Sequence, residues 1–278
     1  MSAGWPASGH LGVRIADDVR VLDGGRLLVG GSPLTVLRLS PVAADLLHQG
    51  QMTVSSPTGA VLTERLLATN IAVPLLDDHP MPDPRDITVV IPVRDRAAQL
   101  DRALAALDHL SCLVVDDGSA DPSAVAAVAT ARGADVMHLP INLGPAGARN
   151  AGLAKVSTPL VAFVDSDVTV TPDALLSLAK HFTDPKVALV GPRIIGTVHT
   201  DHPRWFERYD AARSSLTLGS VPGSVRPGAA VGWLPSACLV GRVEALGSGF
   251  AEDLRVGEDV DLVWRLVAAG NRVRYEPA

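Results

Sequence analysis

The chain has 278 residues, of which 47% are hydrophobic and 19% are charged, and its net charge is −6. This composition supports one large or two smaller folded domains and argues against a disordered protein. The acidic balance disfavours nonspecific nucleic-acid binding, because contacts with phosphates require a basic surface.

The compartment is indicated by the cysteines and by the apolar segments. Cys112 and Cys238 lie in apolar runs, which favours buried free thiols over a disulfide, as in a reducing cytosol. The N-terminus has no basic start followed by an apolar core, so we expect no signal peptide. The longest apolar stretch, residues 229–240, is interrupted by glycine and proline and is shorter than the ~20 residues of a membrane-spanning helix. The sequence therefore predicts a cytoplasmic protein with no transmembrane segment.

The first 75 residues contain short β-like runs followed by helical patterns. Runs at 19–22 and 26–29 flank an Asp-Gly-Gly sequence, which indicates a hairpin, and a further strand is expected at 34–39. Ser40 precedes Pro41 and is expected to cap a first helix, whereas Thr63 is expected to cap a second. Hairpin strands followed by small helices are typical of a winged-helix-type α+β module.

Residues 77–86 contain three prolines and four aspartates, a composition that favours neither helix nor strand. We expect this segment to be a linker. It separates a small N-terminal domain, residues 1–76, from a larger domain, residues 87–278.

After the linker, apolar runs alternate with helical patterns. Leu100, Ala103, Leu104 and Leu107 form one helical stripe, and Pro145 and Thr171-Pro172 mark helix starts. Strands are expected at 87–92, 112–116, 135–139, 160–165 and 187–190. This alternation predicts an α/β fold with a mostly parallel sheet. Residues 198–230 lack periodicity and are expected to form an irregular insertion. His10, His48 and His181 are expected at the surface.

Carboxylates follow two of the predicted strands. Asp165 and Asp167 come after the apolar run 160–164, and Asp116-Asp117 ends the run 112–116. Open α/β sheets bind ligands at the carboxyl ends of their strands. An Asp-X-Asp at such an end suits Mg²⁺ or Mn²⁺ that carries a diphosphate, although a polar turn is the simpler reading. Asp116 and Asp117 suit contacts with a nucleoside or a helix-capping turn, and the sequence does not decide which of them points inward.

Two further segments begin helices and carry charged residues. In the segment 142–152, glycines allow close backbone approach to a ligand and the helix start at Pro145 favours anions, whereas Arg149 by itself is compatible with a surface position. Glu258-Asp259 opens the last helix, where acidic residues complement the helix dipole and could also serve as a general base.

The ordered set of motifs resembles the family 2 inverting glycosyltransferases, which have the GT-A fold and use nucleotide-sugars. The resemblance covers residues 87–278 and implies roles for individual residues. Pro92, Val93, Asp116, Asp117, Arg149 and Asp165 would bind the nucleotide. Asp167, with Asp165 nearer the ribose, would bind Mg²⁺ or Mn²⁺. Asp259, in its pair with Glu258, would be the base. Trp233, Ser236 and Ala237 would lie on the acceptor side, although Trp233 is equally compatible with a core position.

The N-terminal part resembles the PqqD-like peptide-recognition domains. The combination resembles the glycosyltransferases of mycofactocin biosynthesis, which implies transfer of glucose, from UDP-glucose, to a peptide-derived acceptor. Members of the family usually continue beyond the position of Ala278, often with a histidine that completes the metal site and with membrane-associated segments. We therefore expect this chain to be shorter than its relatives.

Three other functions compete with this reading. A non-catalytic nucleotide-sugar and peptide-binding protein is disfavoured by the intact Asp165, Asp167 and Asp259. A family 2 enzyme of polysaccharide synthesis, with a different acceptor, stays open. A nucleotidyltransferase is disfavoured because the segment 91–96 has no glycine for a phosphate-binding loop.

Overall fold

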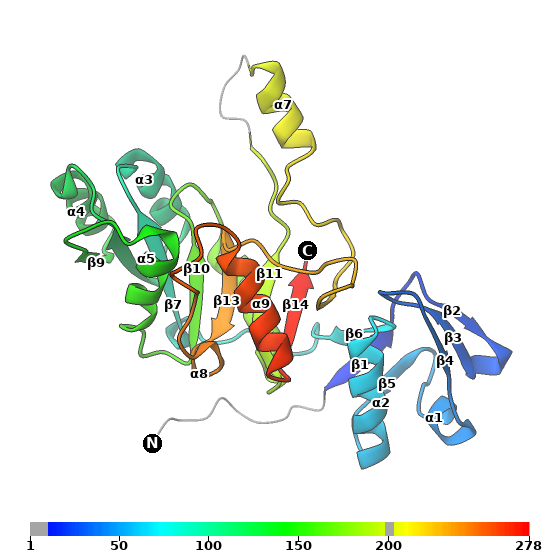
Figure 1. The fold of residues 1–278 in the computed structure, drawn as a ribbon. Helices are drawn as coiled ribbons and strands as arrows, with labels where there is room; N and C mark the ends of the chain where they lie inside the picture. The colour runs from blue at the N-terminus through cyan, green and yellow to red at the C-terminus, as the bar shows by residue number, and fades with distance from the viewer. Residues whose placement is uncertain (1–10, 198–202, 278) are drawn as a thin grey trace.

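The computed structural model describes residues 11–197 and 203–277. It consists of an eight-stranded sheet with helices on both faces and an N-terminal part that packs beside one edge of that sheet (Figure 1). In these two ranges, no helix combines the length and the hydrophobicity needed to cross a bilayer.

The large sheet has the order β12-β14-β11-β13-β10-β7-β8-β9. Strands β10, β7, β8 and β9 run parallel to one another, β13 runs antiparallel between β10 and β11, and β14 runs parallel to β11. The expected mostly parallel sheet is confirmed, but β12, β13 and β14 were not predicted. The strands are β7 (Ile87–Val93), β8 (Ser111–Asp116), β9 (Asp135–His138), β10 (Leu160–Val164), β11 (Val187–Pro192), β12 (Gly223–Val225), β13 (Cys238–Arg242) and β14 (Arg272–Glu276).

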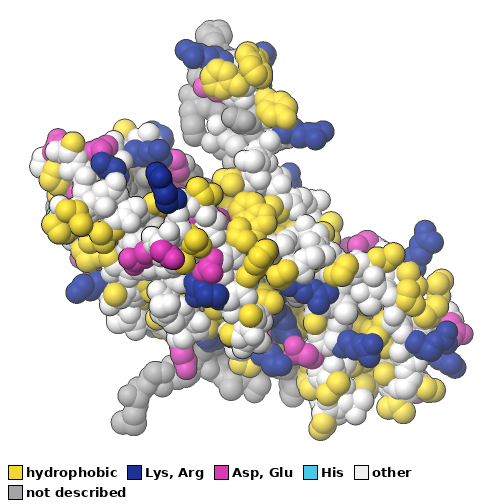
Figure 2. Space-filling model, in the orientation of Figure 1, with side chains coloured by type: hydrophobic (Ala, Val, Ile, Leu, Met, Phe, Trp, Pro, Cys, Tyr) yellow, Lys and Arg dark blue, Asp and Glu magenta, His cyan; other side chains and the backbone are white. Residues whose placement is uncertain are grey.

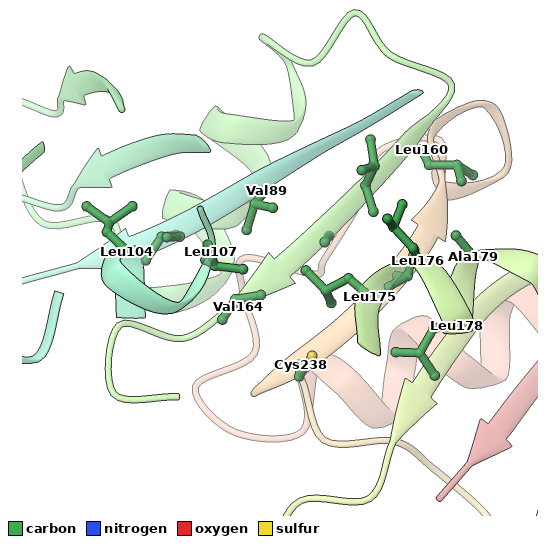
Figure 3. Close-up of a cluster of buried hydrophobic side chains, with 14 of the residues drawn as sticks. Val89, Leu104, Leu107, Leu160, Val164, Leu175, Leu176, Leu178, Ala179 and Cys238 are labelled. Atoms are coloured by element: carbon green, nitrogen blue, oxygen red, sulfur yellow. The ribbon is translucent and has the colours of Figure 1, made fainter. Parts of the chain in front are cut away.

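Side chains that alternate along each strand build a separate core on each face of the sheet. In β10, Leu160, Ala162 and Val164 join one cluster, whereas Val161 and Phe163 join the other. Helices α3 (Ala97–Ala106), α4 (Pro122–Ala131) and α6 (Pro172–Ala179) cover the first face. Figure 3 shows Leu104 of α3 and Leu175 of α6 in this cluster. Helices α5 (Gly144–Leu153), α8 (Val243–Leu246) and α9 (Glu258–Ala268) cover the second. The strand ends between these layers are therefore held by packing from both sides.

The structure tests the predictions made for the cysteines, for a helix start and for the histidines. Cys112 and Cys238 are both free, with Cys238 buried and Cys112 partly buried. Thr171 caps α6 by accepting from the Ala174 nitrogen, as expected. His10 lies outside the described residues and His48 is exposed, but His181 is buried, so the prediction of a surface position for His181 was wrong.

The N-terminal part contains two three-stranded antiparallel sheets, of order β5-β1-β6 and β2-β3-β4. The expected hairpin is present as β2 and β3. The position of the second helix start was wrong: Thr63 lies buried inside α2, and the cap is Ser56, whose Oγ accepts from the Gly59 nitrogen. The elements of this part are β1 (Gly12–Ile15), β2 (Arg20–Leu22), β3 (Leu27–Gly30), β4 (Thr35–Arg38), α1 (Pro41–Asp45), β5 (Gln51–Thr53), α2 (Pro57–Ala68) and β6 (Ala72–Leu75), with a short 3₁₀ turn at Asp23–Gly25. Two further 3₁₀ turns lie outside it, at Pro84–Asp86 before β7 and at Lys180–Thr183 after α6.

The N-terminal part is bonded to the β12–β14 edge of the large sheet. The Ser224 hydroxyl donates to the Leu67 carbonyl at 2.7 Å, and the Asn70 amide donates to the Ser224 carbonyl at 3.1 Å. Glu64 also forms ion pairs with Lys186 at 3.0 Å and with Arg272 at 2.9 Å. These contacts join segments more than a hundred residues apart, so the two parts form one packed unit.

The segment that was expected to be an irregular insertion contains a helix. Residues 198–202 lie outside the described residues, but α7 (Trp205–Ala212) follows them and projects away from the sheet (Figure 1). Trp205, Phe206 and Tyr209 are exposed on α7, and Figure 2 shows hydrophobic side chains gathered there beside Lys and Arg side chains. The chain then returns to the sheet at β12.

Candidate active site

A cleft of about 420 Å³ opens at the carboxyl ends of β7, β8 and β10. Parallel strands present their following loops at this edge, which is where open α/β sheets bind ligands. Of the residues named from the sequence, Pro92, Val93, Asp117, Arg149, Asp165 and Asp167 line the cleft together. Asn142, which begins the segment 142–152, lines it as well, and so do Arg94 and Arg96, which were not singled out.

The two neighbouring aspartates at the end of β8 lie in different surroundings. Asp117 faces the cleft, and its Oδ1 accepts from the Leu143 nitrogen at 2.6 Å. Asp116 is buried and does not line this cleft, because its Oδ2 lies 2.8 Å from His138 Nδ1 and its Oδ1 accepts from the Ser119 nitrogen. Burial pushes the pKa of Asp116 up, but the hydrogen bonds from Ser119 and His138 outweigh it and hold that pKa below its ordinary value. Asp117 is therefore the member of the pair that can meet a ligand in the cleft.

Arg149 projects from α5 into a buried position between two acidic groups. Its side chain is 3% exposed, its Nη2 lies 2.6 Å from Asp165 Oδ1, and its Nη1 lies 3.5 Å from Glu258 Oε1. The guanidinium also lies 5.4 Å from the ring centre of Phe250. Desolvation raises the pKa of Asp165, and the Arg149 charge opposes that rise. Arg149 thus fixes Asp165 and Glu258 relative to each other.

Asp167 lies at the open side of the cleft and contacts Arg96. Arg96 Nη1 is 2.7 Å from Asp167 Oδ2. Sequence reasoning missed Arg96, because a single arginine after a strand carries no motif and its partner lies 71 positions away. The part of the chain that the structure describes holds no cluster of three or more His, Cys, Asp or Glu side chains suited to a metal ion. The pair Asp165 and Asp167 still fits Mg²⁺ or Mn²⁺, because such ions are commonly held by one or two carboxylates together with substrate phosphates.

The start of α9 meets the loop before β13 next to the cleft. Gly257 has φ +88°, a left-handed conformation that turns the chain into α9 and places Glu258 and Asp259 in its first turn. Asp259 Oδ2 accepts from the Ser236 nitrogen at 3.4 Å. The Ala237 carbonyl in turn accepts from the Asp165 nitrogen at 3.0 Å. Residues 236 and 237 therefore link the base candidate to the metal-binding candidate.

Trp233 lies just before this link and is half-buried. Its neighbour Gly232 accepts from the ring nitrogen of Trp264 on α9 at 2.9 Å. The loop before β13 is thus attached to α9 at two points. Trp233 keeps part of its surface open, which leaves both the stacking role and the packing role compatible with the structure.

Fold and motif order place this chain in a known family. Residues 88–235 match glycosyl transferase family 2, and the chain belongs to that family. It is 46% identical over 272 residues to the pre-mycofactocin glycosyltransferase of two strains of Mycobacterium tuberculosis, a match that covers 95% of this chain and 56% of the relative. It is also 30% identical over 207 residues to the succinoglycan biosynthesis protein ExoU of Rhizobium meliloti, covering 69% of this chain and 59% of that protein. The chain thus spans little more than half the length of these curated relatives.

Solved structures show the same fold. The mannosyltransferase PcManGT of Pyrobaculum calidifontis, in complex with GDP-Man and Mn²⁺, matches with a TM-score of 0.52 and 23% identity, covering 73% of this chain and 59% of that one. TarS residues 1–349 of S. aureus, in complex with UDP, matches with a TM-score of 0.51 and 21% identity, covering 68% and 57%. The predicted family and the GT-A type of fold are confirmed. The PqqD-like identity of the N-terminal part stays a prediction.

Proposed function

We propose that this protein is an inverting hexosyltransferase that moves glucose from UDP-glucose to a peptide-derived acceptor of the pre-mycofactocin type. The observation that carries the proposal is the cleft at the ends of β7, β8 and β10, lined by Asp117, Asp165 and Asp167, in a chain that is similar along 95% of its length to a pre-mycofactocin glycosyltransferase. Asp117, Pro92 and Val93 would hold the nucleoside. The TarS complex contains UDP and the PcManGT complex contains GDP-Man, so both support a nucleoside diphosphate for this fold without choosing its nucleobase.

A divalent cation belongs to the proposal. Asp165 and Asp167 supply hard carboxylate oxygens at the end of β10, and the PcManGT complex contains Mn²⁺. Bound by these two residues, Mg²⁺ or Mn²⁺ would offset the negative charge that develops on the departing diphosphate. Arg149 keeps Asp165 in place for this task through its 2.6 Å contact.

Asp259 is the base in this proposal. Its carboxylate would accept the proton of the acceptor hydroxyl as that oxygen attacks the anomeric carbon. Glu258 is the weaker candidate, because Arg149 lies 3.5 Å from its carboxylate and its side chain is largely buried. A base on one side of the sugar and a stabilised leaving group on the other favour a single displacement, which inverts the anomeric configuration.

The acceptor would be recruited by the N-terminal part. We propose the division into residues 1–76, a linker at 77–86 and residues 87–278, with the first part a PqqD-like peptide-recognition domain. Strand β4 pairs only with β3 among the described strands, and a groove of about 460 Å³ lies between β4, α1 and α2. An extended peptide could add to the free edge of β4 and place side chains in this groove.

Calorimetry with UDP, GDP and TDP, with and without Mn²⁺, tests the donor site. We expect the tightest binding for UDP with Mn²⁺. Equal UDP affinity after chelation would remove the metal role of Asp165 and Asp167. Preferential binding of GDP would overturn the choice of uracil as the nucleobase of the donor.

A matched pair of valine substitutions tests the acceptor site. Val61 lines the groove and Val42 lies on α1 outside it, and both side chains are exposed. Val61→Glu should weaken binding and glycosylation of the peptide-derived acceptor, and Val42→Glu should not. If both variants transfer like the parent, the N-terminal part is a structural cap on the β12–β14 edge and not a recruitment domain.

A further inference from the structure

Arg96 contacts the carboxylate that the proposed function assigns to a cation. Its Nη1 lies 2.7 Å from Asp167 Oδ2, in a pair whose side chains are 55% and 49% exposed. Both residues line the same cleft. The arginine therefore occupies the oxygen that a divalent ion would use, and the pair is open enough to solvent for the two side chains to separate.

The three arginines of the cleft differ in how they are held. Arg149 is buried and contacts two carboxylates, so its position is fixed. Arg94 lies 3.8 Å from Asp95, a neighbour in sequence that does not line the cleft. Arg96 alone of the three pairs with Asp167, and a cation bound at that aspartate would release its guanidinium inside the cleft.

A released Arg96 would lie next to a second group that favours anions. Arg96 is the residue before α3, and no side chain caps the first turn of that helix. Free backbone N–H groups at a helix start attract phosphate, and a guanidinium binds phosphate through two parallel hydrogen bonds. Arg96 and the start of α3 thus present positive charge to the same end of the cleft.

Resting on the nucleotide-sugar site proposed above, we propose that Arg96 is a donor-binding residue that changes partners. It holds Asp167 while no cation is bound, and it binds the diphosphate oxygens of the donor once a divalent cation has taken its place at Asp167. Arg96 therefore opposes the binding of the cation alone and favours the binding of cation and nucleotide together. The binding of the cation and the binding of the nucleotide are thereby coupled: each of the two ligands raises the affinity of the site for the other.

This coupling predicts opposite effects of one substitution. Arg96→Ala should raise the affinity for Mn²⁺ alone by about threefold to fivefold, the range expected when a half-exposed ion pair no longer competes. The same substitution should lower the affinity for UDP at saturating Mn²⁺ by about tenfold or more, because a charge-assisted hydrogen bond to phosphate is lost. A purely structural arginine would not produce this pair of effects.

The test titrates Mn²⁺ into the full chain, following the electron paramagnetic resonance signal of the free ion, and then titrates UDP by calorimetry at saturating Mn²⁺. Arg94→Ala is the matched control, since it removes the same charge from the same cleft wall without freeing Asp167. It measures the general effect of one lost charge on both affinities.

The expected result is a gain in Mn²⁺ affinity for Arg96→Ala beyond that of Arg94→Ala, together with a loss in UDP affinity. If the two variants behave alike while the parent binds UDP in an Mn²⁺-dependent way, the partner exchange is wrong and the proposed donor site stands. If the parent binds UDP equally with and without Mn²⁺, the cation role and the partner exchange are both wrong.

Discussion

Replacing Arg149 with glutamine should destabilise the fold far more than the loss of an ordinary surface ion pair. The guanidinium lies between Asp165 and Glu258, at 2.6 Å and 3.5 Å, and stacks over Phe250. Glutamine removes the positive charge and leaves two carboxylates in a poorly hydrated space without a cation. Breaking a buried pair in this way typically costs about 3–5 kcal/mol.

Partial exposure reduces that figure. The Asp165 side chain is 32% exposed and that of Glu258 is 13% exposed, so water screens part of the uncompensated charge. We expect a loss of about 2–3 kcal/mol in the free energy of unfolding. For a chain of this size that loss corresponds to a fall in Tm of roughly 3–5 °C.

Thermal and urea unfolding at pH 7 measure the effect, with Arg132→Gln as the matched control. Arg132 Nε lies 2.8 Å from Asp101 in a pair exposed to solvent, so its loss should cost far less stability than the loss of Arg149. Adding Asp165→Asn to Arg149→Gln should recover part of the stability, because one uncompensated carboxylate disappears. Equal losses in the two single variants, or no recovery in the double variant, would refute the reasoning.

Three further outcomes are expected. Asp259→Asn should keep UDP binding in calorimetry while transfer falls by ~10²–10⁴, and near-normal transfer would point to the neighbouring glutamate. Desolvation lowers the pKa of the buried His181 below its ordinary value of 6.5. As the pH falls, the unfolded chain therefore binds a proton at a higher pH than the folded chain does, and the free energy of unfolding should decrease below pH 6.5. The slope is at most about 1.4 kcal/mol per pH unit, His181→Gln should flatten it in urea unfolding, and an unchanged slope would contradict this origin. Gly118→Ala should weaken UDP binding more than Gly133→Ala in calorimetry. Both glycines have positive φ, but only at Gly118 would a Cβ lie 2.9 Å from the Asn142 nitrogen, and equal affinities would argue against this crowding.

The sequence determined the features that arise from short stretches of chain. The side chains of the runs 87–92 and 160–165 alternate between the two faces of the sheet, so the local sequence is enough to predict these strands. The caps that start α4 and α6 are likewise encoded by a few neighbouring residues. The positions of Asp165 and Asp167 follow from where a strand ends. The motif order then sufficed to predict the family, the fold type and the edge of the sheet that carries the cleft.

The tertiary structure decided everything that depends on partners distant in the chain. Strand β13 enters the sheet antiparallel between β10 and β11, although its own residues carry no signal of direction. Asp117, and not Asp116, faces the cleft, because His138 on β9 holds Asp116 on the other side. Arg96 reaches Asp167 across 71 positions, a contact that no local pattern encodes. Local propensities set which residues form strands and helices, but only packing sets which side chains meet, and the chemistry of this cleft depends on those meetings.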